Sequence, residues 1–221
     1  MESKTLISSI RENIGKVMVG SEETIDLLLT ALIAEGHVLI EDVPGMGKTV
    51  LAKSLAKSVS LEFNRIQFTP DLLPSDVTGL NYFDQKANDF VFSPGPAFCN
   101  LLLATPRTQS SLLECMGERQ ITVDGVTRPL SAPFFVIATQ NPIETLGTYP
   151  LPEAQMDRFF MRISIGYPSM QDEMDILDRY CGEQKPMESV VPVCSAEDVI
   201  AMQQTVKTVY CSKEVRAYIA S

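Results

Sequence analysis

The sequence predicts an α/β protein built around a parallel sheet, and two observations lead to that prediction. Apolar runs at residues 37–41, 101–104 and 134–139 have the length and composition of fully buried strands. Segments with helical spacing of apolar residues separate these runs along the chain. Strands that alternate with helices are typical of a parallel sheet whose two faces are covered by helices.

Composition narrows the classes of protein that the chain can belong to. The 221 residues carry 18 basic and 28 acidic side chains, a formal charge of −10, which argues against strong non-specific binding to nucleic acid or to an anionic membrane but leaves room for a local basic patch. The five cysteines form no CxxC pair, and the single histidine, His37, has no second metal-ligand candidate near it in sequence. With no signal peptide and no apolar run long enough to span a bilayer, we expect a cytoplasmic protein without direct membrane insertion.

Two helices are expected before the first strand. Apolar residues recur at helical spacing over residues 6–17. A second helix is predicted to follow, with Ser21 as its N-cap and Gly36 just past its end, because Ser favours the first of these positions and Gly the second.

The next segment carries the clearest functional motif. Residues 37–41 are predicted to form a strand, residues 42–47 a tight loop and residues 48–59 a helix, and the loop contains Pro-Gly-Met-Gly-Lys-Thr. In a phosphate-binding loop, backbone N–H groups converge on the phosphates, the lysine reaches the β- and γ-phosphates, and the next hydroxyl binds Mg²⁺. Asp42 departs from the pattern, since it stands where a glycine is usual. The predicted nucleotide-binding residues are Asp42, Val43, Pro44, Gly45, Met46, Gly47, Lys48, Thr49 and Val50, with Thr49 as the metal ligand.

The rest of the predicted core contains strands, hairpins and one helix. They are a strand at 63–68, a turn at 70–74, a hairpin at Tyr82–Phe92, a strand at 101–104, a helix at 107–116, a hairpin at Gln120–Leu130 around Asp124-Gly125, and strands at 134–139 and 161–165.

The pattern changes after the break at residues 166–168. Helices are expected at 171–180, 196–206 and 213–220, and Ser195 with Asp198 resembles a capping box at the start of the second of these. We therefore divide the chain into a nucleotide-binding core, residues 1–166, and the beginning of a helical lid, residues 167–221.

Two further polar residues have positions suited to catalysis. Asn141 directly follows the apolar strand, where its amide could orient an attacking water, although an Asn-Pro pair also forms ordinary turns. Arg158 taken alone is expected to be a helix-end cation bonded to Asp157 or Glu153, and it becomes a catalytic candidate only through the resemblance described next.

Together these motifs resemble the MoxR family of AAA+ ATPases. The resemblance depends on Leu39–Thr49, Phe92–Pro96, Gln120–Gly125, Phe135–Pro142 and Gly147–Gln155. It implies that the nucleotide is ATP and that the fold is an AAA+ core with β-hairpin inserts. It also implies that Asn141 is the sensor 1 residue, and that Arg158 is an arginine finger acting on the neighbouring subunit of a homo-oligomeric, hexameric ring.

The resemblance also implies a function. Members of the family hydrolyse ATP to remodel or mature partner proteins, often proteins with von Willebrand factor A domains. In this branch the hairpins at Tyr82–Phe92 and Gln120–Leu130 tend to face the ring pore. A small-metabolite kinase would leave Asn141, Arg158 and both hairpins unexplained.

One departure from the family affects hydrolysis. Leu103-Ala104 runs directly into Thr105-Pro106, where family members have a stretch of the form Asp-Glu-Ile-Asn-Arg-Ala, so the Walker B carboxylates are missing through a natural deletion or a gap in the sequence. Glu114 and Asp76 follow no central strand and are poor substitutes. The sensor 2 arginine would lie beyond Ser221. The alternative to a remodelling motor is therefore a scaffold that binds ATP with impaired hydrolysis.

Overall fold

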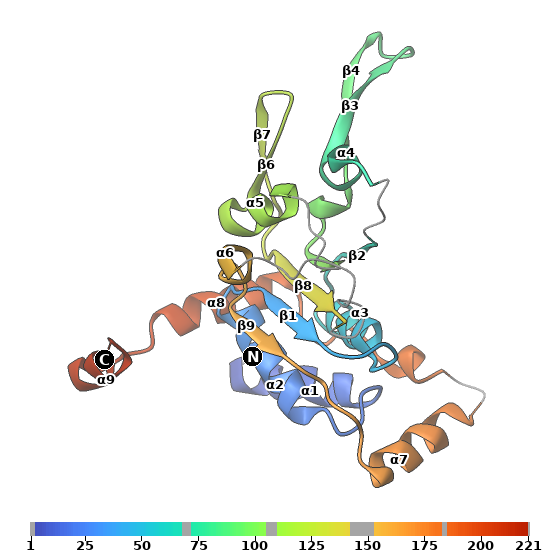
Figure 1. Cartoon of the computed structure of the whole chain (residues 1–221), viewed down its shortest axis with the longest axis vertical. Helices are drawn as coiled ribbons and strands as arrows, with labels where there is room; N and C mark the ends of the chain where they lie inside the picture. Colours follow the sequence, from blue (N-terminus) through green and yellow to red (C-terminus); the bar gives the residue numbers. More distant parts are fainter. Residues whose placement is uncertain (1–2, 68–71, 105–109, 142–152, 183–184, 221) are drawn as a thin grey trace.

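The core is a five-stranded, wholly parallel sheet in the order β2-β5-β8-β1-β9 (Figure 1). The structure is a computed structural model, and it describes residues 3–67, 72–104, 110–141, 153–182 and 185–220. The strands of the sheet are β1 Val38–Glu41, β2 Phe63–Ile66, β5 Leu101–Ala104, β8 Phe135–Gln140 and β9 Met161–Ile163. The α/β fold class predicted from the sequence is confirmed.

Helices and two hairpins complete the described fold. The helices are α1 Ser3–Gly15, α2 Glu22–Ile33, α3 Lys48–Ser58, α4 Pro74–Thr78, α5 Ser110–Glu118, α6 Glu153–Met156, α7 Met170–Tyr180, α8 Ala196–Lys207 and α9 Lys213–Ala220, with 3-10 turns at Pro96–Phe98 and Pro186–Ser189. The hairpins pair β3 Gly79–Asp84 with β4 Asp89–Pro94, and β6 Gln120–Val123 with β7 Val126–Pro129. Within this part of the chain, no helix is both long enough and apolar enough to cross a membrane.

Each face of the sheet has its own hydrophobic cluster. Successive side chains of a strand point to opposite faces, so Leu101 and Leu103 of β5 pack with α1, α2, α3 and α8, while Leu102 and Ala104 pack with α4 and α5. All four side chains are buried. Coverage on both faces explains why the central strands are uninterrupted apolar runs rather than alternating ones.

Among the element boundaries that differ from the predictions, two have a clear physical reason. The helix α4 begins at Pro74, where only a turn was expected, because a proline at the first helical position needs no N–H partner. The strand predicted at residues 161–165 ends at Ile163, because the N–H groups of Ile165 and Gly166 donate to the carboxylate of Asp42 and not to a neighbouring strand. The predicted strand at 63–68, turn at 70–74 and helix at 107–116 each fall partly on residues 68–71 or 105–109, which lie outside the described residues.

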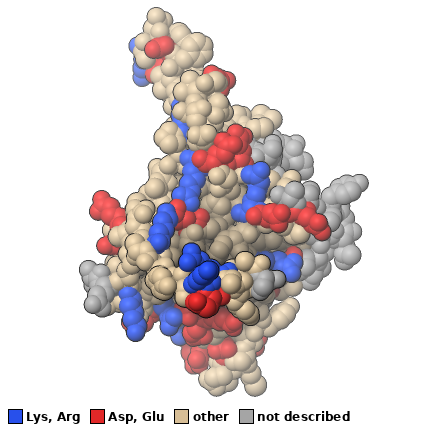
Figure 2. Space-filling view, turned by 90° about the vertical axis from the view of Figure 1, so that its left-hand side faces the viewer, with Lys and Arg blue, Asp and Glu red and all other residues tan. Residues whose placement is uncertain are grey.

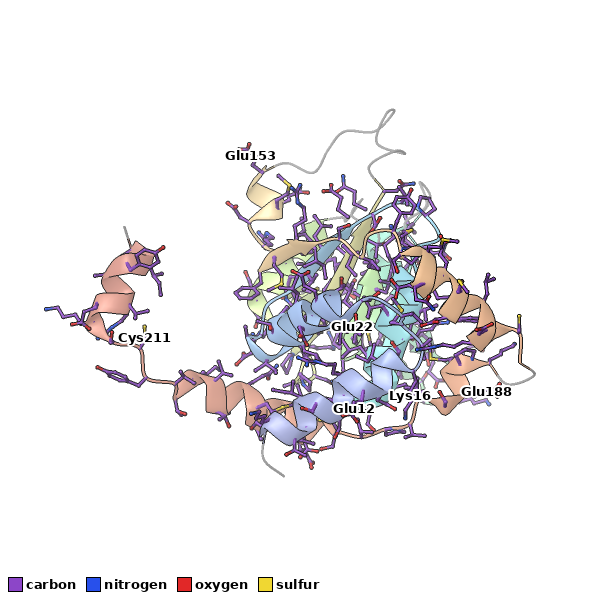
Figure 3. The ribbon with its side chains drawn as sticks, turned by 90° about the horizontal axis from the view of Figure 1, so that it is seen from below. Glu12, Lys16, Glu22, Glu153, Glu188 and Cys211 are labelled. Carbon is purple, nitrogen blue, oxygen red and sulfur yellow. The ribbon has the colours of Figure 1, made fainter. Side chains whose placement is uncertain are left out.

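The predicted lid divides into parts that pack differently. The capping box at α8 is confirmed, since Ser195 Oγ accepts a hydrogen bond from Asp198 N at 3.1 Å. The α8 side chains of Val199 and Met202 belong to the core cluster, whereas α7 and α9 have no buried residue. Figure 3 shows α9 standing away from the body beyond Cys211. The domain boundary at residue 166 stays a prediction. Helix α8 follows this boundary in sequence, but it packs against the core.

The single histidine is part of the core. His37, only 4% exposed, lies just before β1; its Nδ1 accepts from Val136 N at 3.1 Å, and its Nε2 faces the Met116 carbonyl oxygen at 3.2 Å. Since Nδ1 accepts from an N–H group, the proton of the neutral ring is on Nε2. Burial lowers the pKa of His37 to about 4, outweighing the hydrogen bond to Met116.

Acidification is expected to destabilise the fold through His37. The unfolded state protonates near the ordinary pKa of 6.5, and the folded state only near 4. The free energy of unfolding should therefore be constant above pH 6.5 and fall by roughly 3 kcal/mol on going to pH 4. Urea unfolding across this range measures the fall. The variant His37→Gln should show a correspondingly smaller pH dependence, and an equal dependence in both proteins would contradict the assignment.

Candidate nucleotide site

The predicted phosphate loop connects the carboxyl end of β1 to α3. Gly45 and Gly47 have φ angles of +89° and +78°, in the left-handed region that glycine occupies without strain. Gly47 caps α3, which begins at Lys48, and its carbonyl accepts from Leu51 N at 2.9 Å. The free N–H groups at the start of a helix attract anions, so this loop and helix together provide an anion-binding end.

A cavity of about 370 Å³ lies beside the loop. On the side across from the loop it is bounded by the ends of β2, β5 and β8. Its described lining is Pro44, Gly45, Gly47, Lys48, Thr49, Val50, Arg65, Ile66, Leu103, Ala104 and Thr139. Among the described residues, Lys48 and Arg65 are the cations that line this cavity, which we call the phosphate cavity after the predicted role of the loop. Arg65 was not predicted from the sequence, because nothing in its local pattern separates it from an ordinary strand cation.

The Lys48 ammonium is held at the carboxyl edge of the sheet. Its Nζ donates to the carbonyl oxygens of Asp42, of Val43 at 3.2 Å and of Gln140 at 3.4 Å. The last of these belongs to β8, which is the strand next to β1. The hydroxyl of Thr49 lines the same cavity, and an oxygen ligand of this kind suits Mg²⁺.

A second cavity, of about 440 Å³, lies on the other side of the loop and was not predicted. It shares Gly45, Gly47 and Val50 with the phosphate cavity. The remaining lining is mostly apolar: Val17, Met18, Val19, Gly20, Ser21, Met46, Ile165, Gly166, Tyr167, Pro168, Glu173, Ile176 and Tyr180. These residues come from three separate segments, so the only local signal was the short apolar run before Gly20. An apolar cavity adjoining a cationic one fits a nucleotide base next to its phosphates. We call the apolar cavity the base cavity.

The carboxylate of Asp42 points to the connection between β9 and α7. Oδ2 accepts from Ser164 Oγ at 3.0 Å, Ile165 N at 2.8 Å and Gly166 N at 2.9 Å, and Oδ1 accepts from Val43 N at 2.9 Å. Burial raises the pKa of Asp42, but these hydrogen bonds outweigh it and lower the pKa below the ordinary value. As far as the described residues define the two cavities, Asp42 and Val43 line neither.

Asn141 lies beside the phosphate loop. It follows β8 directly, and the register places Gln140 opposite Glu41, so Asn141 emerges next to Asp42 at the carboxyl edge of the sheet. Asp42 N donates to the Gln140 carbonyl at 3.1 Å, which ties the two strand ends together. The structure thus brings Asn141 and the loop to the same edge of the sheet. The catalytic role of Asn141 stays a prediction.

Arg158 lies at the opposite edge. It precedes β9, and Phe160 N donates to the His37 carbonyl at 2.8 Å, at the start of β1. Because the strands are parallel, four residues of β1 separate this point from the loop, roughly 13 Å. Arg158 Nη1 donates to the Leu113 carbonyl of α5 at 2.5 Å, and Figure 1 shows α6 at the start of β9, away from α3. Arg158 therefore faces away from the loop of its own chain.

Neither acidic residue considered as a substitute for the Walker B pair lines the phosphate cavity. Glu114 is exposed on α5. Asp76 accepts from Leu73 N at 2.9 Å and so caps α4.

Comparison with known proteins identifies the family. Residues 37–161 match the profile of the ATPase family associated with various cellular activities (AAA). The chain is 49% identical over 220 residues to the uncharacterised protein YeaC of Bacillus subtilis, covering 97% of this chain and 68% of YeaC. It is 41% identical over 209 residues to the chaperone MoxR1 of Mycobacterium tuberculosis, covering 92% of this chain and 54% of that protein.

A solved structure agrees with these relatives. The crystal structure of a candidate ATPase from Cytophaga hutchinsonii superposes with a TM-score of 0.88 at 41% identity, covering 99% of this chain and 68% of that one. Residues 37–161, which match the family profile, contain the phosphate loop, the strands from β1 to β8 and both hairpins. The chain belongs to the MoxR family of AAA+ ATPases.

Proposed function

We propose that the chain binds ATP, with the base in the apolar cavity and the triphosphate across residues 44–50, the part of the predicted loop that lines the two cavities. The observation that carries this proposal is the pair of cavities that meet at Gly45, Gly47 and Val50. Lys48 and the N-terminus of α3 would contact the phosphates, and Thr49 would hold Mg²⁺, which neutralises phosphate charge when bound. The apolar lining would exclude water from the base.

We further propose that the chain works as a homo-oligomeric ring, hexameric as in the family it resembles. Arg158 is exposed and lies at the edge of the sheet away from the loop of its own chain, so it would act on the nucleotide of a neighbouring subunit. Asn141 would orient the attacking water from within the subunit. Hydrolysis in such a site requires both subunits.

The two hairpins are proposed to contact a protein client. Apolar side chains on the hairpin β3-β4 are exposed, including Phe90 at 71%, and Figure 2 shows the topmost projection as largely uncharged. Arg128 of β7 lies over the ring of Phe92 at 3.8 Å, and Asn81 donates to Asp124 at 2.7 Å, so the hairpins are linked. A cytoplasmic remodelling or maturation role, with a von Willebrand factor A domain protein as client, follows from the family resemblance.

A second candidate function is an ATP-binding scaffold with impaired hydrolysis. The observation that favours it is the direct junction of Ala104 with Thr105, without the Asp-Glu pair of the family. Both candidates bind ATP and differ in turnover, so a turnover measurement separates them.

Assembly is expected to depend on ATP and on Arg158. Light scattering of the full chain should show a ring-sized particle with ATP and Mg²⁺, and a smaller species without them. Arg158→Ala should shift the particle toward monomer, because the cation that would contact the neighbour's phosphate is gone. Arg11→Ala is the matched control, since Arg11 forms an exposed ion pair with Asp26 and should assemble normally. A monomer under every condition would contradict the ring.

A further inference from the structure

Asp42 is bonded through its backbone and its side chain to three different parts of the molecule. Its N–H donates to the Gln140 carbonyl of β8 at 3.1 Å, and its own carbonyl accepts from Lys48 Nζ. Its carboxylate accepts from Ser164 Oγ, Ile165 N and Gly166 N, between 2.8 and 3.0 Å. With an exposure of only 7%, Asp42 is largely shielded from solvent, so competition from water weakens these bonds little.

The segment at residues 164–166 is where the chain leaves the sheet for α7. β9 ends at Ile163, and Gly166 has a φ angle of +76°, a conformation that lets the chain turn sharply. Beyond this turn, Glu173, Ile176 and Tyr180 of α7 line the base cavity, facing the phosphate loop. The direction of the chain at Gly166 therefore sets how α7 closes the base cavity.

Lys48 connects this segment to the phosphates. An ammonium has three N–H donors, and those of Lys48 are directed at carbonyls that include the Asp42 oxygen. A phosphate bound at the loop would compete for these donors, since a charged acceptor makes a stronger hydrogen bond than a carbonyl. Loss of the Lys48 contact would then alter the restraint on the Asp42 backbone, and through it the position of the carboxylate.

We propose that Asp42 is a positioning residue that couples occupancy of the phosphate loop to the connection at residues 164–166, and so to the orientation of α7 over the base. This inference rests on the proposed binding of ATP. It also gives a reason for an acidic residue where phosphate loops usually have glycine: a glycine has no side chain to hold the connection.

Hydrogen–deuterium exchange of the full chain, with and without ATP, tests the coupling. In the unmodified chain ATP should slow exchange in peptides covering residues 43–50 and also in those covering residues 164–180. In Asp42→Gly and Asp42→Asn the first effect should persist, and the second should fall to the smaller slowing that adenosine alone produces, because a base in the cavity contacts Ile165, Gly166 and α7 directly. A merely structural role would raise exchange at residues 164–166 without removing its response to ATP. Asp178→Asn, an exposed change on α7 at a residue that does not line the base cavity, is the control that should keep both responses.

The outcomes separate this inference from the proposed function. No ATP effect at residues 43–50 in the unmodified chain would contradict ATP binding itself. An ATP effect at 164–180 that is undiminished in both Asp42 variants would overturn the coupling while leaving ATP binding intact. Ser164→Ala removes one of the bonds to the carboxylate and should reduce the response at 164–180. If the Asp42 variants do not fold, this variant decides, and an undiminished response in it would overturn the coupling.

Discussion

Inserting Asp-Glu-Ile-Asn-Arg-Ala between Ala104 and Thr105 is expected to raise ATP turnover by about 10²–10³-fold, the typical effect of one well-placed catalytic group. The reason is the position of β5. Ala104, its last residue, lines the phosphate cavity together with Lys48 and Thr49. Carboxylates added at this point would lie beside the bound phosphates, where one can complete the Mg²⁺ shell and the other can polarise the attacking water.

The measurement is steady-state phosphate release at saturating ATP, for the chain as it stands and for the chain with the insertion. A second insertion with Asn-Gln in place of Asp-Glu keeps the length of the connection and removes the charges, so it should stay as slow as the original chain. Fast ATP turnover by the original chain would contradict the scaffold function and show that other groups replace the missing Asp-Glu pair. Equal gains from both insertions would assign the effect to loop length.

Local patterns were sufficient for much of the fold. The buried strands β1, β5 and β8 were predicted because fully covered strands are apolar on both faces. The hairpin β6-β7 was predicted from Asp124-Gly125, and the φ angles of +51° and +77° at these residues are those that its turn requires. The phosphate loop was recognised because a strand before it and a helix after it are themselves visible in sequence.

The rest of the site depends on contacts between distant segments. Asp42 and Ser164 are 122 positions apart, so no local pattern could show that the unusual acid holds the end of β9. The base cavity is assembled from the α1–α2 turn, the loop and α7, each of which is unremarkable alone. The edge on which Arg158 lies became apparent only when β9 was found beside β1.

Replacing Lys48 by alanine is expected to weaken ATP binding by roughly 10–150-fold while leaving adenosine binding unchanged. A hydrogen bond to a charged group contributes about 1.5–3 kcal/mol, and tenfold in affinity corresponds to about 1.4 kcal/mol. Lys48 lines the phosphate cavity but not the base cavity, so the loss should appear only with ligands that carry phosphates. Equilibrium dialysis with ATP and with adenosine measures the difference.

Lys53→Ala is the matched control, because Lys53 is exposed on the same helix and lines neither cavity. It removes an equal charge from α3 at a distance from the loop, and it should bind both ligands as the unmodified chain does. A parallel loss of ATP and adenosine in Lys48→Ala would mean that the loop as a whole had changed shape, since the carbonyls of Val43 and Gln140 lose their common donor in this variant. Undiminished ATP affinity in Lys48→Ala would place the phosphates elsewhere and contradict the proposed site. The difference between the effects of Lys48→Ala on ATP affinity and on adenosine affinity therefore tests whether one nucleotide places its phosphates in one cavity and its base in the other.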